Sequence, residues 1–254
     1  MRQLQLLMGM PVTVEIDDAG VTETAIASVF DYFRAIDDTF SIYKENSEIA
    51  QINRGELPPE AYSDDMRTIL ALSEQTRQET NGYFDILHNG ILDPSGIVKG
   101  WAILQAATML KEAGFQHFYI DAGGDIQVSG YKDGQPGRLW RIGIRNPFNR
   151  NEIVKVLAVT NKGIATSGTA IRGQHIYNPH DPGQQLLDVV SLTVIGPDVY
   201  EADRFATAAF AMGKKGISFI EELPGFEGYM IDTSARATYT TGFERYVLQN
   251  ANTH

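Results

Sequence analysis

The chain has 254 residues, which is enough for one large domain or two small ones. Hydrophobic residues make up 43% of it and charged residues 21%, so a disordered or collagen-like chain is excluded. Its 32 acidic and 21 basic residues give a net charge of −11, which argues against a basic nucleic-acid-binding protein and against docking on anionic lipid. The lack of cysteine excludes disulfides, thiolate zinc sites and a cysteine nucleophile.

Nothing in the sequence predicts a membrane anchor. No apolar run approaches the ~20 residues of a membrane-spanning helix. Residues 1–10 hold one charge and a short apolar patch, without the full hydrophobic region and cleavage site of a signal peptide. We therefore expect no direct membrane span and a cytoplasmic location, or a periplasmic one if an export signal has been removed.

The first half of the chain predicts one strand followed by three helices. Residues 10–16 alternate apolar and polar side chains, as a half-buried strand does. Residues 21–40 place apolar side chains at helical spacing. Residues 64–82 open with two aspartates and close with Asn-Gly, which are helix start and stop signals. A third helix is expected over 97–113 and ends at Gly114.

The rest of the chain is rich in expected strands. Two of them flank Ala122-Gly123-Gly124, which is a hairpin signal. The expected strands are 115–121, 125–129, 140–144, 153–160, 164–167, 187–195, 226–232 and 243–247, and the expected helices are 199–212 and 217–223. Hairpins mixed with separated helices predict an α+β fold. Because no Pro- or Gly-rich linker divides residues 1–254, we expect a single domain.

Asp203 and Thr207 are the first candidates for a functional site. They lie four positions apart on an expected helix, so they share one face, and the alanines around them leave room for a ligand. A carboxylate and a hydroxyl are hard oxygen ligands that suit Mg²⁺. The alternative is an ordinary polar pair on a solvated helix face.

A second candidate is the segment 92–100, where a loop enters a helix. Unpaired N–H groups at a helix N-terminus can bind phosphate oxygens. Ser95 and Gly96 allow the backbone to approach such a ligand closely, and Lys99 could add positive charge. The spacing is not that of a P-loop. A helix cap with a surface lysine is the alternative, which this segment alone favours.

A third candidate combines residues 165–169 with residues 175–179. His175 lies in a loop rich in Gly, Asn, Pro and Asp, and it could act as a general base or bind a ligand by hydrogen bonding. A lone histidine is more often a satisfied structural residue. Thr166-Ser167 could suggest a nucleophile, but no Gly-x-Ser-x-Gly elbow accompanies it.

Two further features have ordinary explanations. The segment 121–125 needs no ligand to explain it, because Gly-Gly is common at a hairpin turn. Tyr43, Tyr83 and Phe84 could stack on a flat ring system, whereas packing in the core is the ordinary role of such side chains.

These segments follow one another in a characteristic order. They are Met8-Gly9-Met10, Phe40-Ser41-Ile42-Tyr43, Asn46-Ser47-Glu48-Ile49, Thr80-Asn81-Gly82-Tyr83-Phe84-Asp85, Gly96-Ile97-Val98-Lys99-Gly100, Asp121-Ala122-Gly123-Gly124-Asp125-Ile126, Thr166-Ser167-Gly168, His175-Ile176-Tyr177-Asn178-Pro179 and Ala202-Asp203-Arg204-Phe205-Ala206-Thr207. None of them is specific alone, but the series resembles the FAD:protein FMN transferase (ApbE) family over most of the chain.

The resemblance implies an α+β fold of mixed sheets and helices in two closely associated lobes, with FAD bound between them. It implies transfer of the FMN half of FAD to a Ser or Thr hydroxyl of an acceptor flavoprotein, typically a subunit of a membrane redox complex, with release of AMP. It also implies Mg²⁺ bound by the Asp203 carboxylate, the Thr207 hydroxyl and a main-chain oxygen of Gly96. The catalytic residues would be His175, as the base, and Asp203.

Further residues match family positions around the flavin nucleotide. They are Met8, Tyr43, Tyr83, Phe84, Asp85, Asp93, Lys99, Ser167, His175 and Tyr177. Thr169 and Asn178 stand where the family has Asp, whereas the expected metal ligands are retained. Two alternatives therefore stay open beside the transferase: a pyrophosphatase that hydrolyses FAD to FMN and AMP, and a non-catalytic flavin-binding protein.

Overall fold

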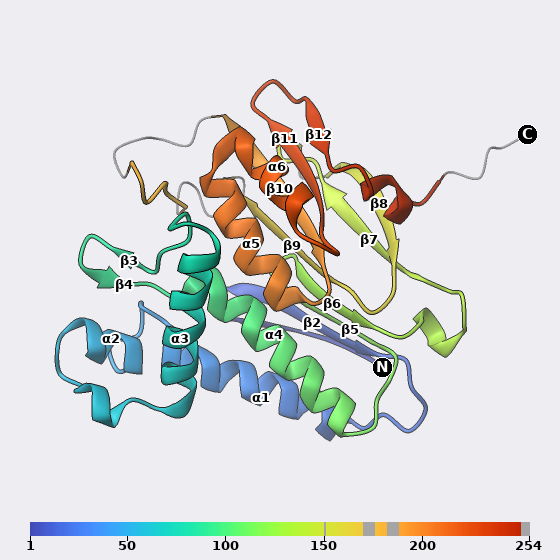
Figure 1. Ribbon diagram of the computed structural model, residues 1–254. Coiled ribbons are helices and arrows are strands. Elements are labelled where there is room, and N and C mark those ends of the chain that lie inside the picture. The colour runs from blue at the N-terminus through green and yellow to red at the C-terminus, as the bar shows by residue number, and fades with distance from the viewer. Residues whose placement is uncertain (150, 170–175, 182–187, 250–254) are drawn as a thin grey trace, which may run out of the picture.

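One antiparallel sheet organises the residues that the computed structural model describes, which are 1–149, 151–169, 176–181 and 188–249. Within these residues the sheet has eight strands in the order β1-β2-β5-β6-β9-β10-β11-β12 (Figure 1). The strands are β1 (Arg2–Leu7), β2 (Met10–Ile16), β5 (Phe118–Ala122), β6 (Asp125–Ser129), β9 (Gly163–Gly168), β10 (Val189–Gly196), β11 (Glu227–Asp232) and β12 (Ala237–Tyr239). Every neighbouring pair runs antiparallel.

The helices gather on one side of this sheet. They are α1 (Glu23–Phe40), α2 (Glu48–Asn53), α3 (Asp64–Glu79), α4 (Ser95–Glu112), α5 (Val199–Ala211) and α6 (Gly216–Glu222). Side-chain oxygens of Thr22, Ser63 and Asp198 accept hydrogen bonds from the first turns of α1, α3 and α5, which satisfies backbone donors that would otherwise be unpaired. The sequence thus marks where these helices begin.

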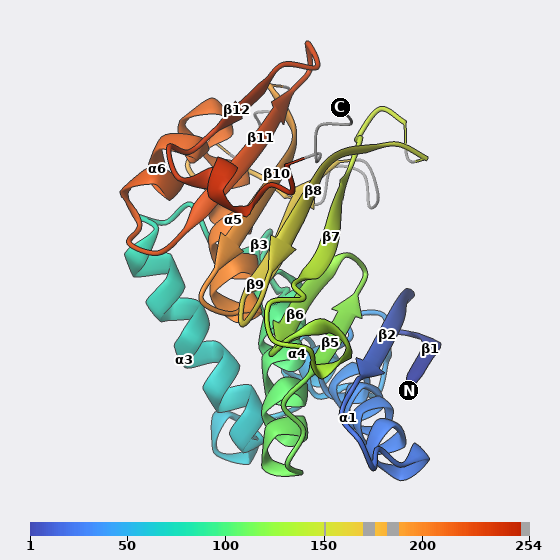
Figure 2. The ribbon, with the colours of Figure 1, turned by 90° about the vertical axis from the view of Figure 1, so that its right-hand side faces the viewer.

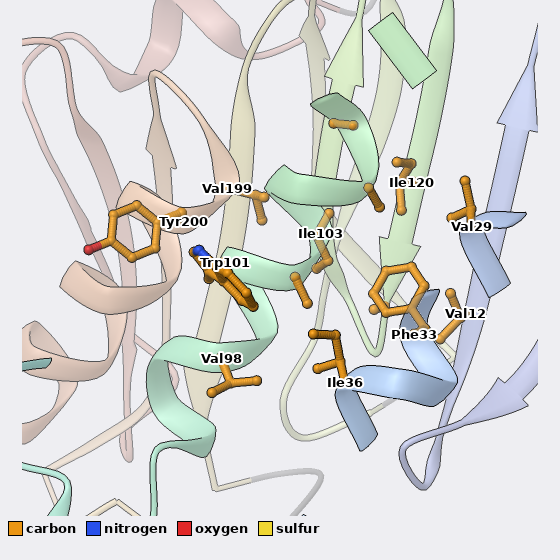
Figure 3. Close-up of a cluster of buried hydrophobic side chains, with 14 of the residues drawn as sticks. Val12, Val29, Phe33, Ile36, Val98, Trp101, Ile103, Ile120, Val199 and Tyr200 are labelled. Carbon is orange, nitrogen blue, oxygen red and sulfur yellow. The ribbon is translucent and has the colours of Figure 1, made fainter. Parts of the chain in front are cut away.

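Helix α4 lies at the centre of the helical layer. It is apolar around most of its circumference, as expected of a helix buried on several sides. Figure 3 shows its side chains between those of α1 and those at the start of α5. The residues that make this contact include Phe33 and Ile36 of α1, Val98, Trp101 and Ile103 of α4, and Val199 and Tyr200 of α5.

A separate hairpin covers part of the other face of the sheet. Its strands are β7 (Trp140–Arg145) and β8 (Ile153–Val159), which pair antiparallel (Figure 2). Alternate residues of β7 are buried, among them Trp140 and Ile142, and they pack in one hydrophobic cluster with Ile164 of β9 and Ile195 of β10. The sheet is therefore enclosed between helices and a hairpin, which confirms the α+β prediction.

Most expected elements are confirmed, but one is wrong. Residues 243–247 do not form a strand, because η4 (Phe243–Tyr246) is a 3₁₀ turn with Phe243 fully buried, and only a single bridge joins Val247 to β8. The apolar residues there anchor a turn, and periodicity over so few positions does not distinguish a turn from a strand.

Some short or edge elements were not expected from the sequence. They are β1, β12, α2, β3 (Leu87–His88), β4 (Ile91–Leu92) and the 3₁₀ turns η1 (Pro59–Ala61), η2 (Lys132–Gly134) and η3 (Gly213–Lys215). Strand β1 lies at the sheet edge and leaves Leu4 and Leu6 exposed, so its apolar residues do not mark a buried face. In the described part of the chain, no helix combines the length and the apolar character needed to span a membrane.

Candidate functional site

Asp203 lies where α5 packs tightly against α4 at Gly100. Its Oδ2 accepts a 2.8 Å hydrogen bond from the backbone N–H of Gly100, and its side chain is only 4% exposed. A Cβ at position 100 would lie 2.6 Å from the Asp203 Cβ, so only glycine permits this approach. The alternative of a solvated helix face is therefore wrong for Asp203.

Thr207 lies one turn further along α5 and faces the first turn of α4. Its Oγ1 is 3.5 Å from the main-chain oxygen of Gly96. A Cβ at position 96 would lie 3.3 Å from both the Thr207 Cγ2 and a ring carbon of Phe84. Thus Gly96 and Thr207 come together in space although 111 positions separate them in the sequence.

Lys99 is not a surface lysine. Its side chain is 17% exposed, and its Nζ lies 2.5 Å from Oδ2 of Asp125 and 3.8 Å from Oδ1 of Asp203. Asp125 was not expected in the site, because its segment had been explained as a turn. It is the first residue of β6 and is 1% exposed. A carboxylate directly after a Gly-Gly turn gives no sequence signal of burial, so only the packing of the helices on the sheet identifies it.

The electrostatics of this cluster favour a cation. Burial raises the pKa of Asp203 well above its usual range, and the nearby Asp125 carboxylate raises it further, while the Lys99 ammonium and the Gly100 N–H oppose the shift. Two buried carboxylates thus share one ammonium, and the surplus negative charge is costly in a low-dielectric interior. A bound cation would remove that cost.

The donor chemistry fits Mg²⁺. Asp203, Thr207 and Gly96 would supply a carboxylate, a hydroxyl and a carbonyl, all hard oxygen donors. Throughout the described ranges no group of three or more His, Asp or Glu side chains is arranged to hold a metal. Mg²⁺ commonly binds through one or two carboxylates and completes its shell with water or phosphate oxygens.

The segment before α4 behaves partly as a helix cap. Helix α4 begins at Ser95, two positions earlier than expected. Oδ1 of Asp93 accepts a 3.0 Å hydrogen bond from the Ser95 N–H, so this carboxylate stabilises the loop that leads into the helix. This hydrogen bond therefore helps to fix the backbone at the start of α4, close to Gly96 and Lys99.

A second group of expected site residues gathers beside this turn. The Tyr177 hydroxyl donates to the main-chain oxygens of Asp85 (3.0 Å) and Leu87 (3.2 Å). The ring of Tyr83 lies 4.5 Å, centroid to centroid, from the ring of His180. Burial, together with nearby carboxylates, raises the pKa of Tyr177 to about 12, so its hydroxyl stays a neutral donor at physiological pH. The structure thus brings Tyr83, Asp85 and Tyr177 together.

The remaining expected residues have different surroundings. Phe84 is 2% exposed and packs in the core near Gly96, whereas Tyr43 is 91% exposed, so core packing is wrong as its explanation. Met8 occupies the β1–β2 turn, where its φ of 52° is left-handed. Ser167 is buried on β9, and His175 lies outside the described residues.

The Ser167 side chain lies on the face of β9 that packs against α5, the helix that carries Asp203 and Thr207. Side chains alternate along a strand, so Ser167 shares a face with Ala165. Ala165 packs in one cluster with Ala202 and Ala206 of α5. The two helix positions bracket Asp203, which places Ser167 on the α5 side of the sheet.

Comparison with known proteins finds relatives that share one name. FAD:protein FMN transferase of Vibrio cholerae is 31% identical over 134 residues, which cover 49% of this chain and 39% of that protein. The enzyme of the same name from Klebsiella pneumoniae is 30% identical over 149 residues, covering 55% and 42%. The matched regions span less than half the length of these curated relatives.

The fold is likewise that of known structures. The crystal structure of the ApbE protein from Thermotoga maritima superimposes with a TM-score of 0.86 at 20% identity, over 98% of this chain and 99% of that one. The model of the ApbE family matches residues 8–91 and 87–230. Because that match covers most of the sequence, the chain belongs to the ApbE family.

Proposed function

We propose that this protein is a Mg²⁺-dependent flavin transferase. It would move the FMN half of FAD onto a Ser or Thr hydroxyl of an acceptor flavoprotein and release AMP. The relatives named FAD:protein FMN transferase support this activity. The observation that carries the proposal is the gathering of Asp203, Thr207 and the Gly96 carbonyl beside the Lys99 ammonium.

The diphosphate of FAD makes this arrangement useful. Attack on phosphorus requires that charge be neutralised and geometry be held, more than it requires covalent chemistry by the enzyme. A Mg²⁺ ion held by Asp203, Thr207 and Gly96 would supply that neutralisation and polarise the attacked phosphate. Lys99 would add a positive charge, which matters in a protein whose net charge is −11.

The transfer itself breaks one bond and forms one. The acceptor hydroxyl oxygen attacks the phosphorus on the FMN side, and the bond from that phosphorus to the bridging oxygen breaks. AMP leaves with the bridging oxygen, and the hydroxyl proton passes to a base. We assign the base to His175, because it directly precedes the described residues 176–181, of which Tyr177 bonds to the main chain of Asp85. General-base catalysis of this kind contributes roughly 10²–10⁴-fold.

Aromatic and polar residues around the site would hold the nucleotide. Tyr83 and the strongly exposed Tyr43 offer ring faces for a flat ring system. Tyr177 and Asp85 are fixed to one another through the Tyr177 hydroxyl and would shape the same pocket. We further propose that the acceptor is a flavin-carrying subunit of a redox complex.

The test is an assay with FAD, Mg²⁺ and a Ser- or Thr-containing acceptor peptide, read by mass spectrometry for an added FMN group. The native protein should form the adduct, and Asp203→Asn should not. Asp31→Asn removes one carboxylate from the exposed side of α1 and should transfer FMN at the native rate. Both variants should keep the native circular dichroism spectrum.

The assay also separates the alternatives. Rapid AMP release from FAD and Mg²⁺ without acceptor, and no adduct when acceptor is added, would identify a pyrophosphatase. A protein that binds FAD and never releases AMP would identify a non-catalytic flavin-binding protein. Full transfer by Asp203→Asn would contradict the metal site.

A further inference from the structure

Asp125 is a buried carboxylate that the proposed chemistry does not use as a ligand. Its side chain is 2% exposed. Oδ1 accepts a 3.0 Å hydrogen bond from the Thr166 N–H, and Oδ2 lies 2.5 Å from the Lys99 ammonium. A carboxylate so far from water is costly unless a cation compensates it. Its pairing with Lys99 therefore matters to the charge of the whole site.

Lys99 lies between two carboxylates and pairs closely with one of them. Its Nζ is 2.5 Å from Asp125 but 3.8 Å from Oδ1 of Asp203. The ammonium sits at the end of a flexible four-carbon chain, so a shift of little more than an ångström would bring it onto Asp203. There it would occupy the carboxylate that we assign to the cation.

We propose that Asp125 is a positioning residue of the cation site: it holds the Lys99 ammonium away from Asp203 and so keeps Oδ1 of Asp203 available to a divalent cation. This role rests on the proposed Mg²⁺ site but not on the identity of the acceptor or on transfer itself. It also places the Lys99 charge at the edge of the site, where an anionic substrate can meet it.

The geometry predicts the effect of removing the Asp125 carboxylate. In Asp125→Asn the amide oxygen can still accept from the Thr166 N–H, so the β6–β9 contact is preserved. The Lys99 ammonium loses its close partner, and Asp203 lies 3.8 Å away. Lys99 should then pair with Asp203 and compete with the cation. Removing the lysine as well should abolish the competition.

The experiment is calorimetric titration of the intact chain with Mg²⁺ in the absence of FAD and acceptor. We expect Asp125→Asn to weaken Mg²⁺ binding by about tenfold or more, the size of effect seen when groups that orient metal ligands are removed. The double variant Lys99→Met/Asp125→Asn should return to within about threefold of the native affinity, since the competing ammonium is gone. Recovery through a second deletion is not expected of a residue that only supports the fold.

Asp121→Asn is the matched control. Asp121 is the last but one residue of β5, the preceding strand of the same hairpin, where it accepts hydrogen bonds from the Tyr119 hydroxyl and the Gly124 N–H. It tests whether loss of any nearby negative charge weakens the site. Its Mg²⁺ affinity should stay within about twofold of native, because the Asp121 carboxylate bonds to Tyr119 and Gly124 rather than to Lys99 or Asp203.

The outcomes decide the proposal. Native affinity in Asp125→Asn, or a loss that the double variant does not recover, would overturn it. The double variant carries no ammonium at position 99, so it can be measured even if Asp125→Asn fails to fold: a tenfold loss of Mg²⁺ affinity there overturns the role, and near-native binding excludes Asp125 as a direct ligand, as the proposal requires.

Failure of the proposed function can be distinguished from failure of the role proposed for Asp125. If the native protein binds Mg²⁺ but does not transfer FMN, the proposed transferase activity is contradicted. The Mg²⁺ titrations of the Asp125 variants still test the positioning role. Native protein that binds no Mg²⁺, with or without saturating FAD, would overturn both.

Discussion

The backbone N–H of Gly100 in α4 donates a 2.8 Å hydrogen bond to Oδ2 of Asp203 in α5. This bond joins the two helices at the candidate metal site, and it exists because position 100 carries no side chain. An added Cβ would lie 2.6 Å from the Asp203 Cβ and 2.9 Å from the main-chain oxygen of Val199. One glycine therefore sets both the helix packing and the position of the carboxylate.

Gly100→Ala should destabilise the protein by about 1–3 kcal/mol, because overpacking outweighs the gain in helix propensity. Urea unfolding measures the change. Gly96→Ala is the control, one turn earlier on the same helix, where the added Cβ meets its neighbours at 3.3 Å. It should cost at least ~1 kcal/mol less than Gly100→Ala. Equal stability of the two variants would contradict the close contact at Asp203.

Thr207→Val should lower both Mg²⁺ affinity and the rate of FMN transfer by at least about tenfold, since it removes a hydroxyl ligand at nearly constant volume. Thr207→Ser keeps the hydroxyl and should remain close to the native protein in both measurements. Metal titration and adduct formation are the readouts. If valine and serine behave alike, the hydroxyl is not a ligand.

His175→Ala should slow FMN transfer by roughly 10²–10⁴-fold while FAD affinity stays near native, because a base acts on the proton of the acceptor. His180→Ala is the control from the neighbouring segment. His180 is exposed, and its Nε2 lies 2.8 Å from the main-chain oxygen of Asn81. A native transfer rate in His175→Ala would remove it from the role of base.

Tyr43→Ser should weaken FAD binding and leave stability unchanged. Its ring is 91% exposed, so the chain loses little packing, and surface substitutions of this kind usually stay within about ±0.5 kcal/mol. A stacked ring contributes about 0.5–1.5 kcal/mol, which corresponds to a several-fold rise in the Kd for FAD. Flavin fluorescence titration and thermal unfolding provide the two measurements. Unchanged FAD affinity would exclude Tyr43 from the site.

Glu79→Gln should reduce stability more at neutral pH than at pH 3. Burial by itself raises the pKa of Glu79, but hydrogen bonds from Gln75 and Arg204 outweigh it and hold the pKa below the ordinary 4.5. The pairing therefore stabilises the fold above about pH 4.5, and this contribution is lost as the pH falls through the lower folded pKa. Because the carboxylate is 38% exposed, solvent screening limits the effect to about 0.5 kcal/mol.

Unfolding curves of Glu79→Gln and the native protein at pH 7 and pH 3 test this dependence. The difference should be present at pH 7 and smaller at pH 3, because the contribution is lost as the pH falls below 4.5 toward and through the lowered folded pKa of Glu79. A difference that is the same at both pH values would show that the ion pair to α5 does not stabilise the fold.

Much of the fold could be predicted from local patterns. Strand β2, helix α1 and the hairpin of β5 and β6 were expected because alternation, helical spacing and Gly-Gly turns are visible within a few residues. The strand expected at 243–247 was wrong for the same reason: three apolar or aromatic residues within five positions fit a buried 3₁₀ turn equally well. The edge strand β1 was missed because Leu4 and Leu6 face solvent.

The sequence by itself determined the α+β class, the family resemblance and the pairing of Asp203 with Thr207 on one helix face, because each depends on spacing along the chain. Only the tertiary structure decided that Asp203 is buried against Gly100, that Lys99 points inward and that Asp125 receives its ammonium. Those contacts join residues on α4, α5 and β6, whose approach is set by side-chain volume at the crossing. No local pattern encodes that distance, so the charge balance of the site appears only after the elements pack.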